Sequence, residues 1–327
     1  MVNVNLMKGD CLELMKSIPD GSVDLILTDP PYGTVKSIGN SDSIEHGMKN
    51  KTQWDETLDF NLMWSEINRV LRKNGKCILF SQEPFTSDLI KSTHNNVPFS
   101  YRCVWIKDHF ANSLIAKKAP VNYFEDVCVF SKLHDNDYLH PLRDYSRSIM
   151  DFIGLNLKQI NSKLGHRRAE HFFYVDSTQF GLCTEKTYIE LIDVFKIDSM
   201  NGFKVFEELD RINSVFNSVF NLPNNAKFKS NVFQYKKDYD GYHPTQKPVA
   251  LLEDLIKTYS NEGDTVMDFT AGSMSTAIAC INTNRNGIMI EKDEHYFKIG
   301  SDRVAQALQE LGDGRINQAL NEKRKLR

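Results

Sequence analysis

Two apolar segments near opposite ends of the chain each lead into a rigid or tight turn, and this pattern constrains the fold most. Residues 23–27 lead into Asp29-Pro30-Pro31-Tyr32, and residues 265–269 lead into a turn that ends at Gly272. A segment with apolar residues at helical spacing follows each turn further along the chain. Strands that alternate with helices in this way predict an α/β fold with a doubly wound, mostly parallel sheet.

The chain pattern predicts that one sheet is built from two distant segments. Further strands are expected over residues 3–7, 76–81, 101–107, 124–131 and 287–291, with Asn74-Gly75 ending the helix that precedes the second of them. Between them lies a stretch that lacks a strand pattern and shows helical periodicity instead. The expected organisation is a first α/β half over 1–142, a helical insert over 143–225, a second α/β half over 226–312 and a basic, fraying tail over 313–327.

Composition excludes several classes of protein. The formal net charge of −3 gives no overall attraction to phosphate, so a nucleic-acid partner would have to meet a local basic surface. The six cysteines are scattered without a CxxC pair, which fits neither a zinc site nor a disulfide framework, and no metal site is expected. The chain begins without a signal-peptide pattern and has no long apolar run, so we expect a cytoplasmic protein with no membrane partner.

Acidic residues stand at or just beyond three expected strand ends, at Asp268, Glu291 and Asp10. Ligands of doubly wound sheets bind outside the carboxyl ends of the strands. The Gly272 turn lets backbone approach a ligand, Glu291 can accept both hydroxyls of a ribose, and Asp10 can reach an adenine. We expect the strand before Asp10 to neighbour the strand that ends in Glu291. The alternative is a tight strand-to-helix turn with a solvated helix cap.

The segment His243-Pro244-Thr245-Gln246-Lys247-Pro248 is more specific. Together with Asp29-Pro30-Pro31-Tyr32 upstream, it resembles the motifs of beta-group S-adenosylmethionine-dependent DNA adenine-N6 methyltransferases, of phage or restriction-modification type. The resemblance covers about residues 1–142 and 226–312. It implies a seven-stranded methyltransferase sheet in permuted order, S-adenosyl-L-methionine as cofactor, and double-stranded DNA as the substrate, with a flipped adenine in a specific sequence as target. The cofactor-binding residues that it implies are Asp10, Cys11, Asp29, Thr245, Lys247, Asp268, Phe269, Gly272, Ser273, Thr276 and Glu291.

The implied catalytic residues are Asp29, Pro30, Pro31 and Tyr32. An exocyclic amine on a base is a poor nucleophile because its lone pair is delocalised into the ring, so catalysis needs acceptors for its N–H bonds and a clamp on its position. Asp29 supplies a carboxylate, Pro30 a carbonyl, and Tyr32 a ring that can stack on the base. Two alternatives stay open: cytosine-N4 transfer, although those enzymes more often begin this motif with Ser, and a DNA-binding protein that has lost catalysis.

The second alternative rests on Met274, which stands where related loops commonly carry glycine. A non-glycine residue with positive φ would be strained there, and its side chain could crowd the cofactor. Because the surrounding motif residues are present, we predict that Met274 packs away from the cofactor. Residues 33–57 form a long polar stretch that predicts a lid or a disordered segment. We expect it to be mobile without DNA, with Trp54 as a hydrophobic anchor when closed.

The insert is the expected DNA-contacting part. Leu157, Ile160 and Leu164 lie on one helical face, Gly165 allows a turn, and Arg167 and Arg168 open a second expected helix. A helix, a glycine turn and a helix with cations at its start is the geometry of major-groove readers. We therefore predict Arg167 and Arg168 as DNA-binding residues and the following aromatic residues, 172–174, as core. The alternative is a small helical bundle with a solvated charged face. A homodimer and a cognate restriction endonuclease are further candidate partners.

Overall fold

The computed structural model describes residues 2–33, 57–111, 117, 120–133, 140–177, 179–223, 226–242 and 245–325. The expected lid around Trp54 and the residues His243 and Pro244 lie outside this set. The chain forms two compact units, one made of Met1–Leu133 and Val219–Arg327 and the other of His134–Ser218. The two ends of the sequence therefore belong to one unit.

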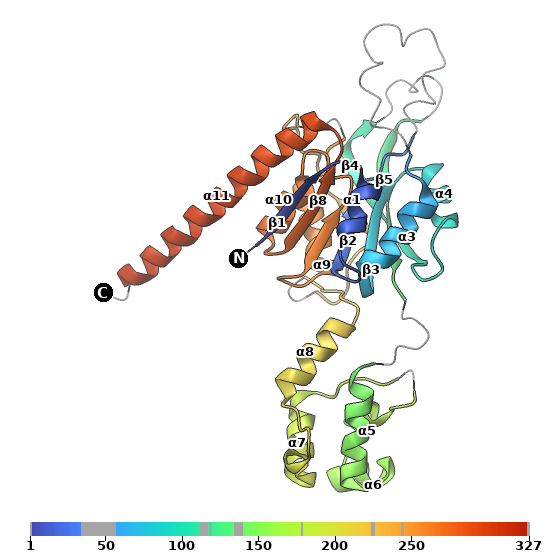
Figure 1. Ribbon diagram of the computed structural model, residues 1–327, viewed down its shortest axis with the longest axis vertical. Coiled ribbons are helices and arrows are strands. Elements are labelled where there is room, and N and C mark those ends of the chain that lie inside the picture. The colour runs from blue at the N-terminus through green and yellow to red at the C-terminus, as the bar shows by residue number, and fades with distance from the viewer. Residues whose placement is uncertain are drawn as a thin grey trace. The chain divides into compact units, whose positions relative to one another are not determined.

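An eight-stranded sheet forms the centre of the larger unit in the described part of the chain, one strand more than predicted (Figure 1). Its order is β1-β8-β7-β2-β3-β5-β4-β6. The strands are β1 (Val4–Lys8), β2 (Val23–Thr28), β3 (Leu71–Ser81), β4 (Phe99–Ala111), β5 (Asn122–Ser131), β6 (Val232–Gln234), β7 (Thr265–Asp268) and β8 (Asn286–Glu291). Only β5 runs antiparallel to its neighbours among these strands.

The expected pairing between the two chain ends is confirmed. β1 lies parallel to β8, with Lys8 opposite Glu291, and β2 lies parallel to β7. The extra strand, β6, is short and pairs with the outer side of β4. Sequence order and sheet order thus differ as the permuted arrangement requires.

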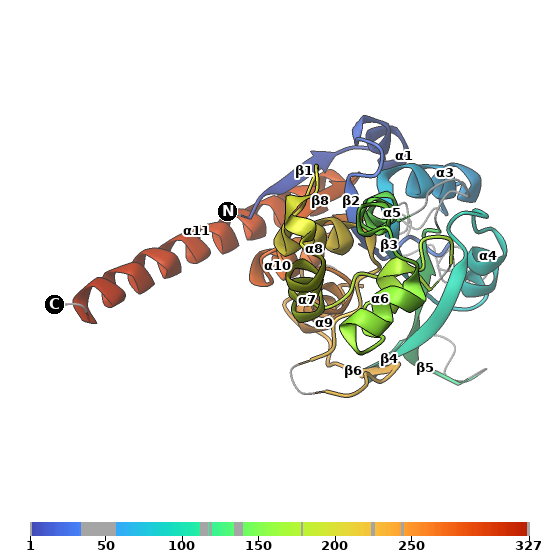
Figure 2. The ribbon, with the colours of Figure 1, turned by 90° about the horizontal axis from the view of Figure 1, so that it is seen from below.

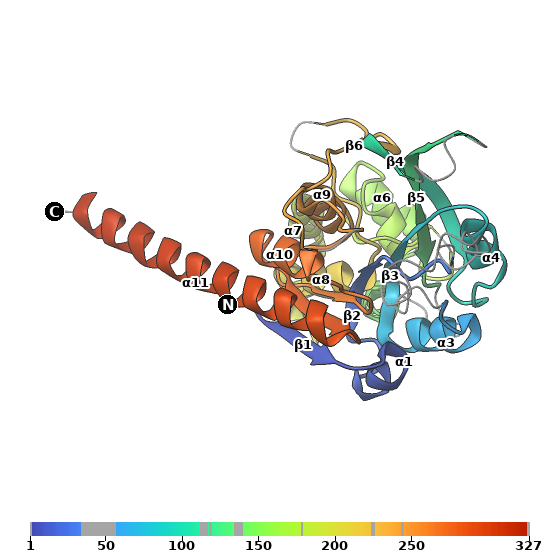
Figure 3. The same ribbon diagram turned by 90° about the horizontal axis from the view of Figure 1, so that it is seen from above.

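Helices cover both faces of this sheet, which makes it doubly wound (Figure 3). One face packs against α9 (Val249–Tyr259), α10 (Ser275–Asn282) and α11 (Glu294–Lys325) through an apolar core that includes Leu255, Cys280 and Val304. The other face packs against α1 (Cys11–Leu14), η1 (Met15–Ser17), α3 (Phe60–Val70) and α4 (Phe85–Lys91), with Trp64 buried in its core. Most of the stability of these amphipathic helices comes from such packing.

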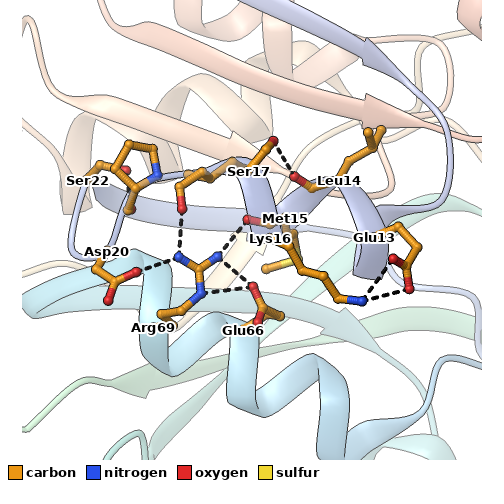
Figure 4. A network of polar contacts seen from close by, with 11 residues as sticks. Glu13, Leu14, Met15, Lys16, Ser17, Asp20, Ser22, Glu66 and Arg69 are labelled. Carbon is orange, nitrogen blue, oxygen red and sulfur yellow. Dashed lines mark hydrogen bonds and ion pairs between the residues drawn. The ribbon is translucent and has the colours of Figure 1, made fainter.

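Arg69 of α3 fastens the turn that precedes β2 (Figure 4). Its guanidinium donates to the carbonyls of Met15 and Ile18, each at 2.7 Å, and pairs with Asp20 and Glu66, each at 2.6 Å. The contact gives Asp20 a structural role. The contacts fix where β2 begins, and β2 in turn delivers Asp29.

The largest differences from the predicted element boundaries are at the end of α3 and at the end of α11. α3 ends at Val70, and Asn74-Gly75 lies within β3 instead of ending the helix, because Leu71 is fully buried and already pairs with Val23 of β2. A Cβ on Gly75 would lie 2.9 Å from the carbonyl oxygen of Asp24, so glycine allows this close approach. At the other end of the chain, α11 continues past Gly312 to Lys325, where fraying was expected; the sequence there is rich in helix-favouring residues.

The smaller unit is helical and has its own core (Figure 2). Its elements are α5 (Leu142–Ile153), α6 (Leu157–Leu164), η4 (Glu170–Phe173), α7 (Glu185–Phe195), η5 (Ile197–Ser199) and α8 (Phe206–Phe216). Phe172 and Phe173 are buried in that core, as predicted, whereas Tyr174 is only half-buried. The chain rejoins the larger unit where Asn221 donates its backbone N–H to Thr258 of α9 at 2.7 Å.

Candidate functional site

One large pocket, of about 950 Å³, lies in the larger unit, at the carboxyl ends of the parallel strands. It brings together every residue of that unit that the sequence predicted for catalysis or cofactor binding. These are Asp10, Cys11, Asp29, Pro30, Pro31, Tyr32, Thr245, Lys247, Asp268, Phe269, Gly272, Ser273, Thr276 and Glu291. The position agrees with the rule that doubly wound sheets bind ligands outside the carboxyl ends of their strands.

Asp268 ties together the ends of the two central strands. Its carboxylate accepts hydrogen bonds from the Thr28 hydroxyl at 2.6 Å, the Thr276 hydroxyl at 2.6 Å and the Thr270 backbone N–H at 3.1 Å. Burial raises the pKa of Asp268 to about 6, against the effect of these donors. Thr270 also donates to the Asp29 carbonyl at 3.1 Å, so the loop after β7 holds the backbone of the Asp29 segment in place.

Glu291 and Asp10 lie side by side because β8 pairs with β1. The Glu291 carboxylate accepts the backbone N–H groups of Gly272 and Asp293, both at 2.7 Å, and burial raises its pKa while these donors oppose the shift. Asp10 caps α1 by accepting the Leu12 N–H at 3.0 Å and lies 3.0 Å from the Lys292 ammonium. This end of the pocket therefore offers two carboxylates of fixed orientation.

Phe269 and Cys11, both predicted to bind the cofactor, form an apolar part of the pocket wall. Phe269 is almost fully buried, and Cys11 is buried beside it in the same core. Burial raises the pKa of the Cys11 thiol to about 12, so this side chain stays a neutral thiol at neutral pH.

Met274 adopts the left-handed conformation, with φ of 65° and ψ of 32°, and its side chain is fully buried. Met274 is not among the described residues that line the pocket, although its neighbours Ser273 and Ser275 are. The side chain packs instead against Gly300 of α11, where a Cβ would come within 2.1 Å of its Cγ. The methionine occupies space that the absence of a side chain at Gly300 leaves open.

At the other end of the pocket, Asp29 is held by two partners. The Tyr32 hydroxyl donates to Asp29 Oδ1 at 2.6 Å, and the Lys247 ammonium bonds to Oδ2. The Tyr32 ring lies 5.1 Å from the Phe85 ring, centroid to centroid. Lys247, which the sequence predicts to contact the cofactor, lines the pocket and pairs there with Asp29.

Several polar residues of the pocket were not predicted from the sequence, among them Lys107, Glu125 and Gln246. Lys107 of β4 and Glu125 of β5 form a buried ion pair, and Glu125 Oε2 lies 3.1 Å from Lys247 Nζ. Gln246 also lines the pocket, and its buried Nε2 has no acceptor among the described residues. Gln246 lies within the motif at residues 243–248, so the sequence could have indicated it as a site residue. Lys107 and Glu125 become neighbours only through the register of β4 and β5.

The predicted helix-turn-helix is wrong in its second helix. α6 ends at Gly165 in the left-handed conformation, as expected, but η4 is a single 3₁₀ turn of four residues. Residues 172–173 anchor this turn in the core, which leaves no length for a recognition helix. Arg167 pairs with Glu170 at 2.8 Å and Arg168 with Glu190 at 3.0 Å, and both arginines are well exposed.

The chain is similar in sequence to known DNA methyltransferases. A family model described as DNA methylase (N6_N4_Mtase) matches residues 23–302. The chain is 23% identical to the type II methyltransferase M.HpaI of Haemophilus parainfluenzae, over 91% of this chain and 73% of that protein. It is 27% identical to the DNA adenine methyltransferase YhdJ of Escherichia coli (strain K12), over 91% of this chain and 82% of that protein.

Solved structures share the fold. The complex of M1.HpyAVI with SAM aligns with a TM-score of 0.51 and 19% identity, covering 92% of this chain and 98% of that one. The cytosine-N4-specific PvuII DNA methyltransferase aligns with a TM-score of 0.51 and 14% identity, covering 95% of this chain and 93% of that one. The architecture is thus that of DNA methyltransferases. Since the family model spans most of its length, the chain belongs to the N6_N4 DNA methylase family. Across the described residues, no helix combines the length and apolar character needed to cross a membrane.

Proposed function

We propose that this chain transfers the methyl group of S-adenosyl-L-methionine to the exocyclic N6 amine of adenine in a specific double-stranded DNA sequence, after flipping the base. The observation that carries the proposal is that one pocket of about 950 Å³ is lined by both the Asp29 segment and the Gly272 and Glu291 segment. Methyl transfer requires donor and acceptor in one water-poor site, in line with each other.

The residues at the Glu291 end fit this cofactor. Each carboxylate oxygen of Glu291 has a lone pair beyond the one used by its backbone donor, and can accept a ribose hydroxyl. Asp10 and Cys11 would border the adenine, and the unpaired Gln246 Nε2 is a donor that the carboxylate of the cofactor would satisfy. When bound, the cofactor supplies an electrophilic methyl group on a sulfonium.

The residues at the Asp29 end fit an amine as target. Asp29 accepts one N–H of the amine and the Pro30 carbonyl accepts the other, which localises the nitrogen lone pair for attack. Tyr32 holds the Asp29 carboxylate through its hydroxyl while its ring offers a stacking surface to the base. After transfer the nitrogen carries an extra proton, and Asp29 is the group placed to take it.

Adenine is favoured over cytosine by the motif and by the relatives. The segment begins with Asp29 rather than Ser, and YhdJ is named as an adenine enzyme. The likeness to the cytosine-N4-specific PvuII enzyme is one of fold, so cytosine-N4 transfer is the alternative that the experiment must separate. Met274 packs against Gly300 of α11 and does not line the pocket, so it gives no support to the alternative of a DNA-binding protein that has lost catalysis.

Double-stranded DNA would meet the exposed Arg167 and Arg168 of the smaller unit, which can bind phosphate or guanine once released from their glutamate partners. We also propose a cytoplasmic location, in keeping with a DNA substrate. A homodimer and a cognate endonuclease remain candidates for partners.

The test is transfer of tritiated methyl from S-adenosylmethionine to plasmid DNA, followed by chromatography of the digested bases. The proposal expects label in N6-methyladenine for the wild type and a loss of at least about 10²-fold in rate for Asp29→Ala, since a preorganised polar contact to the reacting group is removed. Label in N4-methylcytosine would support the alternative, and no label would support the binder.

A further inference from the structure

Four charged side chains alternate along one side of the pocket, in the order Lys107, Glu125, Lys247 and Asp29. The Lys107 ammonium bonds to Glu125 Oε1, Glu125 Oε2 lies 3.1 Å from Lys247 Nζ, and Lys247 Nζ bonds to Asp29 Oδ2. The lysine side chains are 2% and 7% exposed, and all four residues line the pocket. We call these four residues the charge chain.

The charge chain has a cost that the fold alone does not require. Lys107 and Glu125 come from adjacent antiparallel strands, β4 and β5, whose other inward positions are apolar, such as Cys103 and Val127. Burying ions is expensive, and apolar residues of similar volume commonly stabilise a fold at least as well. A buried chain of ions that ends at Asp29 therefore points to a role at the site.

We propose that Lys107 and Glu125 are positioning residues that set the charge of Asp29 through Lys247. With two lysines and two carboxylates the charge chain is neutral, so the Lys247 ammonium can serve Asp29 without being drawn wholly to Glu125. Asp29 is thereby kept as a carboxylate that faces the target amine. The inference rests on the proposed function, because it assigns Asp29 to the amine.

The groups that face Asp29 come from four separate segments of the chain. The pKa of Asp29 is raised overall: burial raises it most, Lys247 lowers it, Glu125 raises it further, and the Tyr32 hydroxyl lowers it. Asp268 at the end of β7 is a second buried carboxylate that is coupled to Asp29 through space. Two carboxylates, Glu125 and Asp268, and only one of the ammonium groups named here, that of Lys247, thus act on Asp29. The negative charge dominates unless a second cation neutralises Glu125.

Lys107 provides that neutralisation. Burial opposes ionisation of Glu125, but Lys247 and Lys107 together bring its pKa below the ordinary value. Burial likewise lowers the pKa of Lys107 while Glu125 raises it, with Lys247 and Lys237 as nearby like charges. Removing Lys107 would leave Glu125 and Asp29 to share a single ammonium, and one of two carboxylates that share a site binds its proton more tightly.

The charge chain makes predictions of opposite sign for its two outer members. In the pH profile of kcat/KM for DNA, Lys107→Met moves the acid limb to higher pH by about one unit, since one charge of the neutralising pair is lost. Glu125→Gln moves the acid limb to lower pH, since Asp29 then has Lys247 to itself. Lys107→Arg keeps the charge and leaves the limb in place, and the double variant Lys107→Met with Glu125→Gln returns it toward the wild-type position.

A second readout does not need activity. In ¹³C NMR spectra of protein labelled at the aspartate carboxyl carbons, the signal that Asp29→Asn removes reports the titration of Asp29. The same opposite shifts are expected there. If the protein methylates nothing yet these shifts occur, the proposed function fails and the charge coupling stands. If the wild type methylates adenine but neither profile nor titration moves in Lys107→Met or Glu125→Gln, the present inference is overturned.

Lys229 offers a matched control. Its ammonium pairs with Asp254 at 2.6 Å, is 10% exposed and lies 5.5 Å from the Phe233 ring centroid, much as Lys107 lies 5.6 Å from that of Trp105. Lys229 lies outside the pocket wall drawn from the described residues. Lys229→Met should lower stability without moving the acid limb; an equal shift in this variant would mean that the Lys107 effect is a general consequence of losing a buried lysine, and would overturn the inference.

Discussion

Replacing Met274 with glycine separates strain in the cofactor loop from packing beneath it. The wild-type side chain is fully buried at positive φ, so the change has two opposing effects. Loss of a buried methionine costs about 2–5 kcal/mol, and relief of a left-handed non-glycine residue returns about 1–2 kcal/mol. We expect Met274→Gly to lower the free energy of unfolding by about 1–3 kcal/mol. Because Met274 is not among the residues that line the pocket, the change in S-adenosylmethionine affinity should be less than about tenfold, which corresponds to about 1.4 kcal/mol.

Urea unfolding and calorimetric titration of the cofactor measure the two effects separately. The partner residue gives a control: Gly300→Ala alone should destabilise the wild type, because its Cβ would come within 2.1 Å of Met274 Cγ. In the Met274→Gly background the same alanine should cost much less, which is a coupling that a double-mutant cycle detects. If Met274→Gly raised cofactor affinity more than tenfold and left stability unchanged, this reasoning would be refuted. The alternative of a DNA-binding protein that has lost catalysis would then be favoured.

Three further predictions follow from the site and the smaller unit. Glu291→Ala should weaken cofactor binding by about 1–3 kcal/mol in calorimetry, through loss of charge-assisted hydrogen bonds to the ribose; unchanged affinity would leave Glu291 a structural role. Arg167→Ala with Arg168→Ala should reduce the salt dependence of DNA binding by up to about 2 units of slope, and an unchanged slope and methylated motif would place recognition elsewhere. Because the pKa of Asp268 is raised in the folded state, its ionisation favours unfolding. The free energy of unfolding of the wild type should therefore fall relative to that of Asp268→Asn, which does not titrate, by about 1–3 kcal/mol as the pH rises from about 4 to about 6, and a difference between the two that is independent of pH would contradict the burial argument.

The pocket was predictable as far as its residues stand in local patterns. An apolar strand followed by an acid and a rigid turn can be read from neighbouring residues, and so can the glycine turn after Asp268. The pairing of β1 with β8 followed from the assumption of one sheet, since Asp10 and Glu291 then had to end adjacent strands.

Residues that act through strand register were not predictable in this way. Lys107 and Glu125 are ordinary charged residues in the sequence, and only the antiparallel pairing of β4 with β5 places them together at the pocket. The partner of Met274 is likewise invisible locally, because Gly300 lies in a helix that follows β8. The second helix of the insert failed because the aromatic residues after Arg168 are held by core packing in a 3₁₀ turn, which apolar spacing does not distinguish from an α-helix.

Single-molecule sequencing of DNA from cells that express this chain tests the central claim most directly, because it reports the modified base and its sequence context together. The account predicts the kinetic signature of N6-methyladenine at one short motif in cells with the wild type, and none in cells with an equal amount of folded Asp29→Ala protein. A signature of N4-methylcytosine, or adenine methylation that persists in the Asp29→Ala strain, would contradict it.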